Sequence, residues 1–141
     1  MSIIFTNGCF DVFHYGHLEI LKFAKSLGND LHVGINSDSS IRKLKGPNRP
    51  IISQNQRLEI VSACKYVDYV YLFDEPTPIK LIEQIRPDII VKGGDWKPHE
   101  VVGCHIAEVV ICPLVPDIST TKIIKKILEQ KKTKRSFKIN E

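Results

Sequence analysis

Short apolar runs rich in isoleucine and valine alternate with segments of helical period along most of the chain. Five of these runs are too short for helices and indicate strands, at residues 3–5, 31–35, 68–73, 88–91 and 108–111. Their apolar residues are more often continuous than alternating, which is typical of strands that helices cover on both faces. The order of elements predicts an α/β fold, a Rossmann-like doubly wound parallel sheet of five strands in a single domain.

The segments between the strands carry the start and stop signals of helices. Ser53 and Gln56 form a capping-box pattern, and Thr77-Pro78 places a proline at a first helical position. We expect helices at residues 15–27, 53–65 and 77–85, and a short helix followed by a surface loop at residues 36–50. We expect Ser119 to cap a last helix whose buried side carries Ile123, Ile124, Ile127 and Leu128.

The charge distribution argues against a nucleic-acid partner. The net charge is +4, and residues 130–141 account for all of it with five basic residues and one acid. Such a segment is typical of a solvated, flexible terminus, so we divide the chain into a domain at 1–129 and a basic tail at 130–141. No apolar run approaches the roughly 20 residues of a membrane span, and no leader pattern precedes the first strand. We therefore expect a cytoplasmic protein that binds neither nucleic acid nor membrane.

The stretch T-N-G-C-F-D-V-F-H-Y-G-H, residues 6–17, lies between the first strand and the first helix, where such folds bind ligands. Its Cys9, Asp11, His14 and His17 could form a metal site, Cys9 could serve redox chemistry, and the histidines could merely cap the helix. Phosphate binding needs fewer assumptions, because a helix N-terminus with imidazole donors and nearby glycines suits a polyphosphate.

H-Y-G-H at 14–17 and I-S-T-T-K at 118–122 resemble the two signatures of the nucleotidylyltransferase superfamily, in the right order and on the right elements. The resemblance covers residues 2–129. Within the superfamily, the chain looks most like the adenylyltransferase domain that makes ADP-heptose for lipopolysaccharide cores. The similar stretches are T-N-G-C-F-D, V-G-I-N-S-D, L-K-G-P-N-R-P-I, F-D-E-P-T-P and V-K-G-G-D-W. Many relatives fuse this domain to a sugar kinase, whereas the resemblance here implies a stand-alone version.

Two alternatives stay open. The glycerol-3-phosphate cytidylyltransferases share both signatures and a G-D-W-type segment, and Trp96 is more typical of them. They carry arginine where this chain has Leu114, which favours the heptose enzyme. A regulatory domain that binds nucleotide without turnover is the second alternative.

The resemblance implies transfer of AMP from ATP to D-glycero-β-D-manno-heptose 1-phosphate, with Mg²⁺ accompanying ATP and no metal site built by the protein. It assigns catalysis to His14, His17, Lys45 and Lys122. It assigns nucleotide binding to Thr6, Asn7, Gly8, Phe10, Gly16, Gly94, Asp95, Trp96, Ser119 and Thr120. It assigns binding of the acceptor to Asp11, Asp38 and Arg57, and Asp11 or Asp38 could alternatively orient the magnesium ion. Superfamily members commonly form homodimers.

Overall fold

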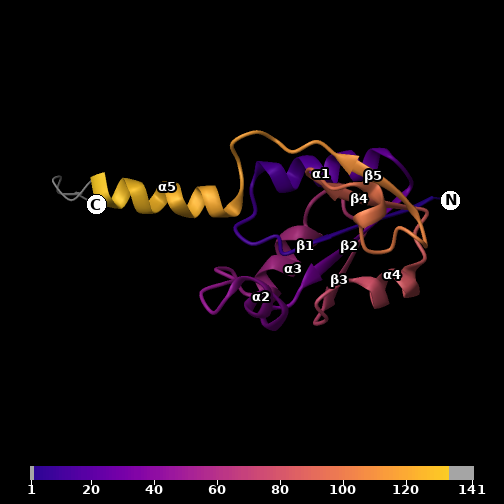
Figure 1. Cartoon of the computed structure of the whole chain (residues 1–141), viewed down its shortest axis with the longest axis horizontal. Coiled ribbons are helices and arrows are strands. Elements are labelled where there is room, and N and C mark those ends of the chain that lie inside the picture. The colour runs from indigo at the N-terminus through magenta and orange to yellow at the C-terminus, as the bar shows by residue number, and fades with distance from the viewer. Residues whose placement is uncertain (1, 134–141) are drawn as a thin grey trace.

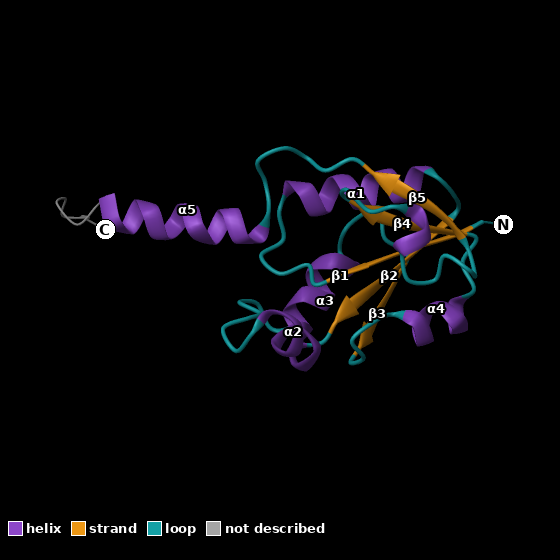
Figure 2. Cartoon of the chain, in the orientation of Figure 1, coloured by secondary structure: helices purple, strands orange, loops and turns teal. Residues whose placement is uncertain are grey.

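The structure is a computed structural model that describes residues 2–133. Its centre is one parallel sheet with the strand order β3-β2-β1-β4-β5 (Figure 2). The strands are β1 (Ile3–Gly8), β2 (Asp30–Asn36), β3 (Tyr69–Phe73), β4 (Ile89–Gly93) and β5 (Glu108–Cys112). This confirms the predicted fold class. The strand order reverses direction between β1 and β4, which is the place where open α/β sheets bind ligands.

Helices cover both faces of the sheet. They are α1 (Tyr15–Ser26), α2 (Asp38–Lys45), α3 (Gln54–Ser62), α4 (Ile79–Ile85) and α5 (Thr120–Thr133), with a 3₁₀ turn η1 at Pro98–Glu100. On one face, α1 and α3 bury Leu21, Ala24 and Val61 against the sheet. On the other face, Ile82 of α4 and Val101 pack on Phe5 and Ile90. The central strands β1 and β4 are thus apolar on both faces, with Ile4 and Val91 toward one layer of helices and Phe5 and Ile90 toward the other, which explains their continuous apolar runs in the sequence.

Three details of the helices differ from the prediction. Helix α4 begins at Ile79 with Pro78 as its N-cap, so the proline does not occupy the first helical position and Thr77 is not the cap. Ser53 is the N-cap of α3, but its side chain makes no capping hydrogen bond, so the predicted capping box does not form. Instead the Gln54 side chain accepts a hydrogen bond from the backbone N–H of Asp38 at 3.0 Å, which joins the starts of α2 and α3. The segment predicted as a basic tail begins inside α5, and residues 134–141 lie outside the described part of the chain.

Helix α5 leaves the body of the protein instead of packing along it (Figure 1). The body holds its first turn, where the Thr120 hydroxyl donates to the Asp11 carbonyl at 2.6 Å. Of the predicted buried side, Ile123 and Ile124 are half-buried, but the prediction is wrong for Ile127 and Leu128, which are 60% and 54% exposed. Helical period shows that a helix has an apolar side, but it does not show what covers that side. No helix among the described residues is long and apolar enough to cross a membrane.

A buried arginine ties the carboxyl ends of the central strands together. Arg57 on α3 is 1% exposed. Its Nη1 donates to the carbonyls of Cys9 and Asn36, both at 2.7 Å, and its Nε donates to the Ile52 carbonyl at 2.9 Å. Its Nη2 pairs with the Asp38 carboxylate at 2.8 Å. One side chain therefore joins the loops after β1 and β2 to the start of α2 and the start of α3.

We expect Arg57→Leu to lower the free energy of unfolding by about 3 kcal/mol or more, because it leaves buried carbonyls without a hydrogen-bond donor and removes the ion-pair partner of Asp38. Urea denaturation measures this change. Arg42→Leu is the matched control, since Arg42 is exposed on α2 and should change stability by less than about 0.5 kcal/mol. Equal, small effects of the two substitutions would contradict the structural role of Arg57.

Candidate active site

Two histidines cap the first helix. The Nδ1 of His14 accepts a hydrogen bond from the Gly16 N–H at 3.1 Å, and the Nδ1 of His17 accepts from the His14 N–H at 3.1 Å. This is a capping box built from imidazoles instead of the usual hydroxyl and carboxylate. A Cβ on Gly16 would lie 2.9 Å from the His14 ring, so the glycine makes room for it. The two histidines therefore do cap the helix, and the cap occupies the Nδ1 atom of each ring.

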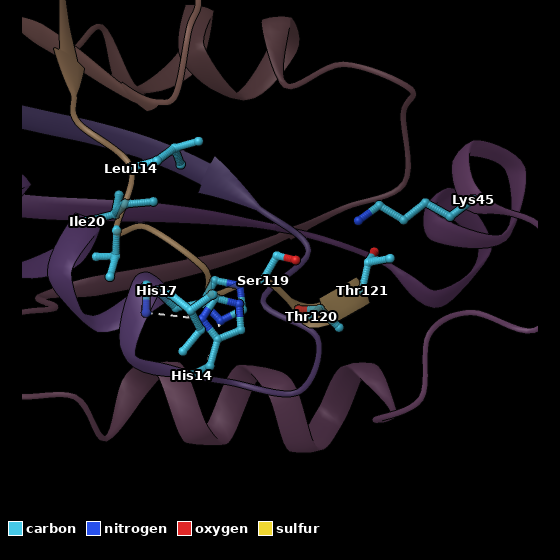
Figure 3. A pocket seen from close by; sticks show the side chains of 11 residues that line it. His14, His17, Ile20, Lys45, Leu114, Ser119, Thr120 and Thr121 are labelled. Carbon is cyan, nitrogen blue, oxygen red and sulfur yellow. Dashed lines mark hydrogen bonds between the residues drawn. The ribbon is translucent and has the colours of Figure 1, made fainter. Parts of the chain in front are cut away.

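The capping bonds assign the tautomers of the two rings. A nitrogen that accepts from a backbone N–H carries no proton, so each neutral ring holds its proton on Nε2. The rings stack with centroids 3.7 Å apart (Figure 3). Burial, followed by the charges of His14 and Lys45, lowers the pKa of His17 from 6.5 to about 3, and burial also lowers the pKa of His14. Both side chains are thus neutral hydrogen-bond donors at physiological pH.

The histidines line a cavity of about 260 Å³ together with the start of α5, although the two segments lie about a hundred residues apart in the sequence. Ser119 caps α5 by accepting from the Lys122 N–H at 3.1 Å. The N-terminal ends of α1 and α5 both border the cavity, so their unpaired N–H groups and partial positive charges act there together. The lining residues are His14, Gly16, His17, Ile20, Lys45, Leu114, Val115, Ile118, Ser119, Thr120 and Thr121.

The two predicted lysines differ, because Lys45 lines the cavity and Lys122 does not. Lys45 is the last residue of α2, which ends at Gly46 with φ 97°, and its side chain reaches toward Ser119 and Thr121 (Figure 3). Lys122 is not among the lining residues; it is exposed, with its ammonium 3.8 Å from the Asp117 carboxylate. The sequence prediction missed Thr121, which lines the cavity although only Thr120 was assigned to it. The second threonine of S-T-T-K was the available signal.

Asp11, expected to bind the acceptor, is 1% exposed. Its carboxylate accepts from the N–H groups of Ile51 and Ile52 at 2.8 and 2.9 Å and from Arg49 Nε at 3.3 Å. It thus fastens the segment after α2 to the loop between β1 and α1. Among the described residues, Nη2 of the same Arg49 is buried without a hydrogen-bond partner.

The other two residues expected at the acceptor, Asp38 and Arg57, pair with each other. With Asp11, they form a layer of polar contacts beneath the site, and none of the three lines the histidine cavity or the two cavities beside it. In this structure their contacts set the positions of backbone segments around the cavity.

A second cavity, of about 160 Å³, adjoins the first at the end of β1. It is lined by the predicted residues Thr6, Asn7, Gly8 and Phe10, together with Cys9, Lys92 and Gly93, and it shares His17, Ile20 and Leu114 with the first cavity. Phe10 and Val12 have φ of 51° and 49°, an uncommon backbone conformation for side-chain-bearing residues. This strained loop makes the sharp change of direction from β1 to the histidines.

The predicted segment after β4 lies farther along the same edge of the sheet. Gly94 has φ 107°, which suits glycine, and its N–H donates to the Cys112 carbonyl at 3.1 Å. Asp95 is exposed. Trp96 lines a third cavity, of about 60 Å³, with Asn7 and Lys92. The structure thus brings Trp96 to the site edge, in a cavity separate from that of the histidines.

The residues around the site suit a metal ion that binds together with a ligand, which supplies most of the groups that coordinate the ion. Within residues 2–133, no three histidine, cysteine or acidic side chains converge to hold a metal. Mg²⁺ in phosphate sites takes most of its ligands from phosphate oxygens and water, with one or two protein carboxylates at most. The donor set of this chain is therefore suited to an ion bound mainly by a polyphosphate.

Comparisons with known proteins show the family of the chain. The family described as cytidylyltransferase-like matches residues 5–126. The chain is 50% identical over 134 residues to the bifunctional protein HldE of Syntrophotalea carbinolica and 51% identical over 131 residues to that of Campylobacter concisus. These matches cover 92% of this chain but 27% and 28% of those proteins, so the chain spans little more than a quarter of their length. Among solved structures, the lipopolysaccharide core biosynthesis protein of Thermoplasma volcanium is similar with a TM-score of 0.69 and 31% identity, over 82% of this chain and 97% of that one.

The titration of His17 should be visible in the pH dependence of stability. Its folded pKa of about 3 lies below the unfolded value of 6.5, so the neutral ring contributes stability above pH 6.5 that is lost as the pH falls toward 3. His17→Gln keeps an acceptor for the cap but cannot titrate. We expect the wild type to lose stability relative to His17→Gln between about pH 7 and about pH 4, measured by urea denaturation. Parallel curves for the two proteins would contradict the lowered pKa.

Proposed function

Since the chain belongs to the cytidylyltransferase-like family of nucleotidyltransferases, we propose that it transfers AMP from ATP to D-glycero-β-D-manno-heptose 1-phosphate. The products are ADP-heptose, a precursor of lipopolysaccharide core, and pyrophosphate. The observation that carries the proposal is the single cavity at which the H-Y-G-H and S-T-T-K segments meet. The relatives named HldE and the lipopolysaccharide core biosynthesis protein support the heptose acceptor. ATP and sugar phosphates are intracellular metabolites, so we propose a cytoplasmic location.

The reaction needs alignment and charge stabilisation more than a general base. A phosphate oxygen of the acceptor attacks the α-phosphorus of ATP, and the bond from that phosphorus to the bridging oxygen of pyrophosphate breaks. The attacking oxygen is already anionic near neutral pH, so no residue has to remove a proton from it. What the protein must provide is positive charge and hydrogen-bond donors for the phosphate oxygens in the transition state.

The side chains of the first cavity supply that chemistry. The Nε2–H groups of His14 and His17 donate to the triphosphate, and the first turn of α5 offers Ser119, Thr121 and its free N–H groups to the β and γ phosphates. Lys45 adds a positive charge from the opposite side. Mg²⁺, bound with ATP, would neutralise further phosphate charge.

The same cavity supports ATP as the nucleotide. Leu114, which stands where the cytidylyltransferases of the resemblance have arginine, borders both the first and the second cavity. With Ile20, Val115 and Ile118 it makes an apolar surface beside the phosphate-binding groups. Such a surface suits a purine ring. We propose that Gly94 and Asp95 lie along the ribose.

Pyrophosphate release in the presence of Mg²⁺ tests this function. We expect release from ATP with heptose 1-phosphate, and little from CTP with glycerol 3-phosphate. Release only from CTP with glycerol 3-phosphate would overturn the proposal in favour of a cytidylyltransferase. If neither ATP nor CTP gives pyrophosphate with either heptose 1-phosphate or glycerol 3-phosphate, the result would favour a nucleotide-binding regulatory domain.

His17→Ala is the control that assigns turnover to this site. It should lower kcat by about a hundredfold or more, because it removes a donor to the transition state. Loss of the cap should lower the free energy of unfolding by only about 1 kcal/mol. If His17→Ala instead lowers the activity and the fraction of folded protein to the same extent, His17 has a structural role.

We also propose that two copies associate through α5. Its exposed Ile127 and Leu128 lie beside Lys125 and Lys126 in the sequence. A groove on α3, of about 370 Å³, has the complementary character, because apolar side chains and Glu59 line it. Its lining residues are Ile52, Gln56, Glu59, Ile60 and Ala63. The α5 helix of one copy would lie in the α3 groove of the second, and the same contact repeated would close a symmetric dimer.

We expect the wild type to be dimeric in light scattering, and both Ile127→Asp and Ile60→Asp to be monomeric, since each buries a charge in the proposed contact. Tyr69→Asp is the control, because Tyr69 is 51% exposed on β3, outside both surfaces. A monomeric wild type would contradict the proposed dimer, and dimers that survive both substitutions would place the interface elsewhere.

A further inference from the structure

Three cavities form a row along the carboxyl edge of the sheet. The first and second share His17, Ile20 and Leu114, and the second and third share Asn7 and Lys92. The first cavity contains the groups assigned above to the triphosphate. The third lies at the far end of the row, so a molecule bound there would approach the triphosphate from the other side. Its chemistry therefore bears on the second substrate.

Lys92 is the residue that joins the second and third cavities. It lies near the end of β4 and is half-buried, and its ammonium stands 5.2 Å from the centroid of the Trp96 ring. Among the described residues, no carboxylate forms an ion pair with this ammonium. Burial lowers the pKa of Lys92, and the nearby Cys9 opposes that shift. The site thus holds a partly desolvated cation that forms no ion pair with a carboxylate in the described part of the chain.

A cation in this position favours an anionic ligand. Removing an ammonium from water costs free energy unless an opposite charge compensates for it, and among the described residues no carboxylate lies within ion-pair distance of this ammonium. Lysine binds phosphate as a compact point charge with three donors. A phosphate in the second cavity would contact Lys92 on one side and lie near His17 on the other, because both residues line that cavity.

The other residues of the third cavity suit a polyol. Asn7 offers an amide, Glu100 a carboxylate, and Trp96 an aromatic face, while Val101 and Val102 complete the wall. Amide and carboxylate groups bind hydroxyls, and the ring can cover the apolar C–H side of a sugar. The three cavities together therefore fit a nucleotide, a phosphate and a sugar in that order.

We propose that Lys92 binds the phosphate of the acceptor, and that the cavity between Asn7, Trp96 and Glu100 holds the hydroxyls of its sugar. This inference rests on the proposed function and adds an acceptor subsite to it. It places Asn7 and Trp96 against the acceptor, whereas the sequence resemblance placed both against the nucleotide. No additional chemical step is involved, since Lys92 positions the attacking phosphate oxygen and retains its proton.

Substitution of Lys92 tests the subsite. Lys92→Met should raise the KM for heptose 1-phosphate by about tenfold to a hundredfold, the range expected for a hydrogen bond to a charged group. The KM for ATP should stay within about twofold, because ATP occupies the first cavity. Lys92→Arg restores the charge and should recover most of the acceptor affinity. Lys65→Met is the matched control, since the Lys65 ammonium also lies 5.2 Å from an aromatic ring, that of Tyr66, but lines none of the three cavities.

A binding measurement separates failure of the subsite from failure of the proposed function. Isothermal titration calorimetry with a non-hydrolysable ATP analogue present gives the Kd of heptose 1-phosphate, glycerol 3-phosphate and inorganic phosphate. If the wild type turns over heptose 1-phosphate but Lys92→Met leaves the acceptor KM and Kd unchanged, the subsite is wrong and the function stands. If turnover fails but Lys92→Met weakens binding of glycerol 3-phosphate, the subsite stands and the heptose acceptor is wrong.

Two further outcomes would overturn the subsite. One is equal weakening of ATP and acceptor by Lys92→Met, which would place Lys92 in the nucleotide site. The other is a wild type that binds none of the three phosphate probes. Thermal unfolding of each variant shows that it is folded, and Lys92→Met should fold because it removes a partly buried charge that has no ion-pair partner among residues 2–133.

Discussion

The Arg57 guanidinium is the interaction on which the geometry of the site depends. It binds the carbonyls of Cys9 and Asn36 and the carboxylate of Asp38, and so holds the ends of the two central strands in one arrangement. A planar group with five donors can satisfy several acceptors from different segments at once, which an ammonium cannot do with the same geometry. The loop that begins at Cys9 then leads to Asp11 and the histidines. A residue that is 1% exposed can thus set the positions of the backbone segments around a site.

Helix termini provide the second constraint. The histidines use Nδ1 to cap α1, and this leaves Nε2–H as the remaining donor of each ring beside the cavity that both residues line. Burial keeps the rings neutral, so they can stack closely without charge repulsion. The Asp11 carbonyl accepts from Thr120 and thereby brings the start of α5 against the same cavity. Two helix N-termini and two neutral donors thus border one cavity, with less electrostatic repulsion between the two rings than two imidazolium ions would have.

Much of the fold and part of the site could be predicted from the sequence. The strands followed from short apolar runs, and the helices from their caps and glycines, because these signals are local. Ser53 shows where local signals fail, since its capping pattern is present but the bond is not formed. Lys92 was missed for a related reason. A lysine in a strand gives no sequence signal of its surroundings, and the absence of an ion pair to Lys92 within residues 2–133 is visible only when the neighbouring segments are in place.

The sequence by itself determined the order of strands and helices, the apolar character of both sheet faces, and the two motifs that border the first cavity. Tertiary structure decided which polar residues face that cavity and which lie beneath it, so that Asp11, Asp38 and Arg57 hold backbone while Thr121 and Lys92 reach the cavities. It also decided that α5 extends from the body with Ile127 exposed. The physical reason is the distance along the sequence over which each kind of interaction acts. Propensity and period act over a few residues, whereas burial and hydrogen bonding join residues from distant parts of the chain.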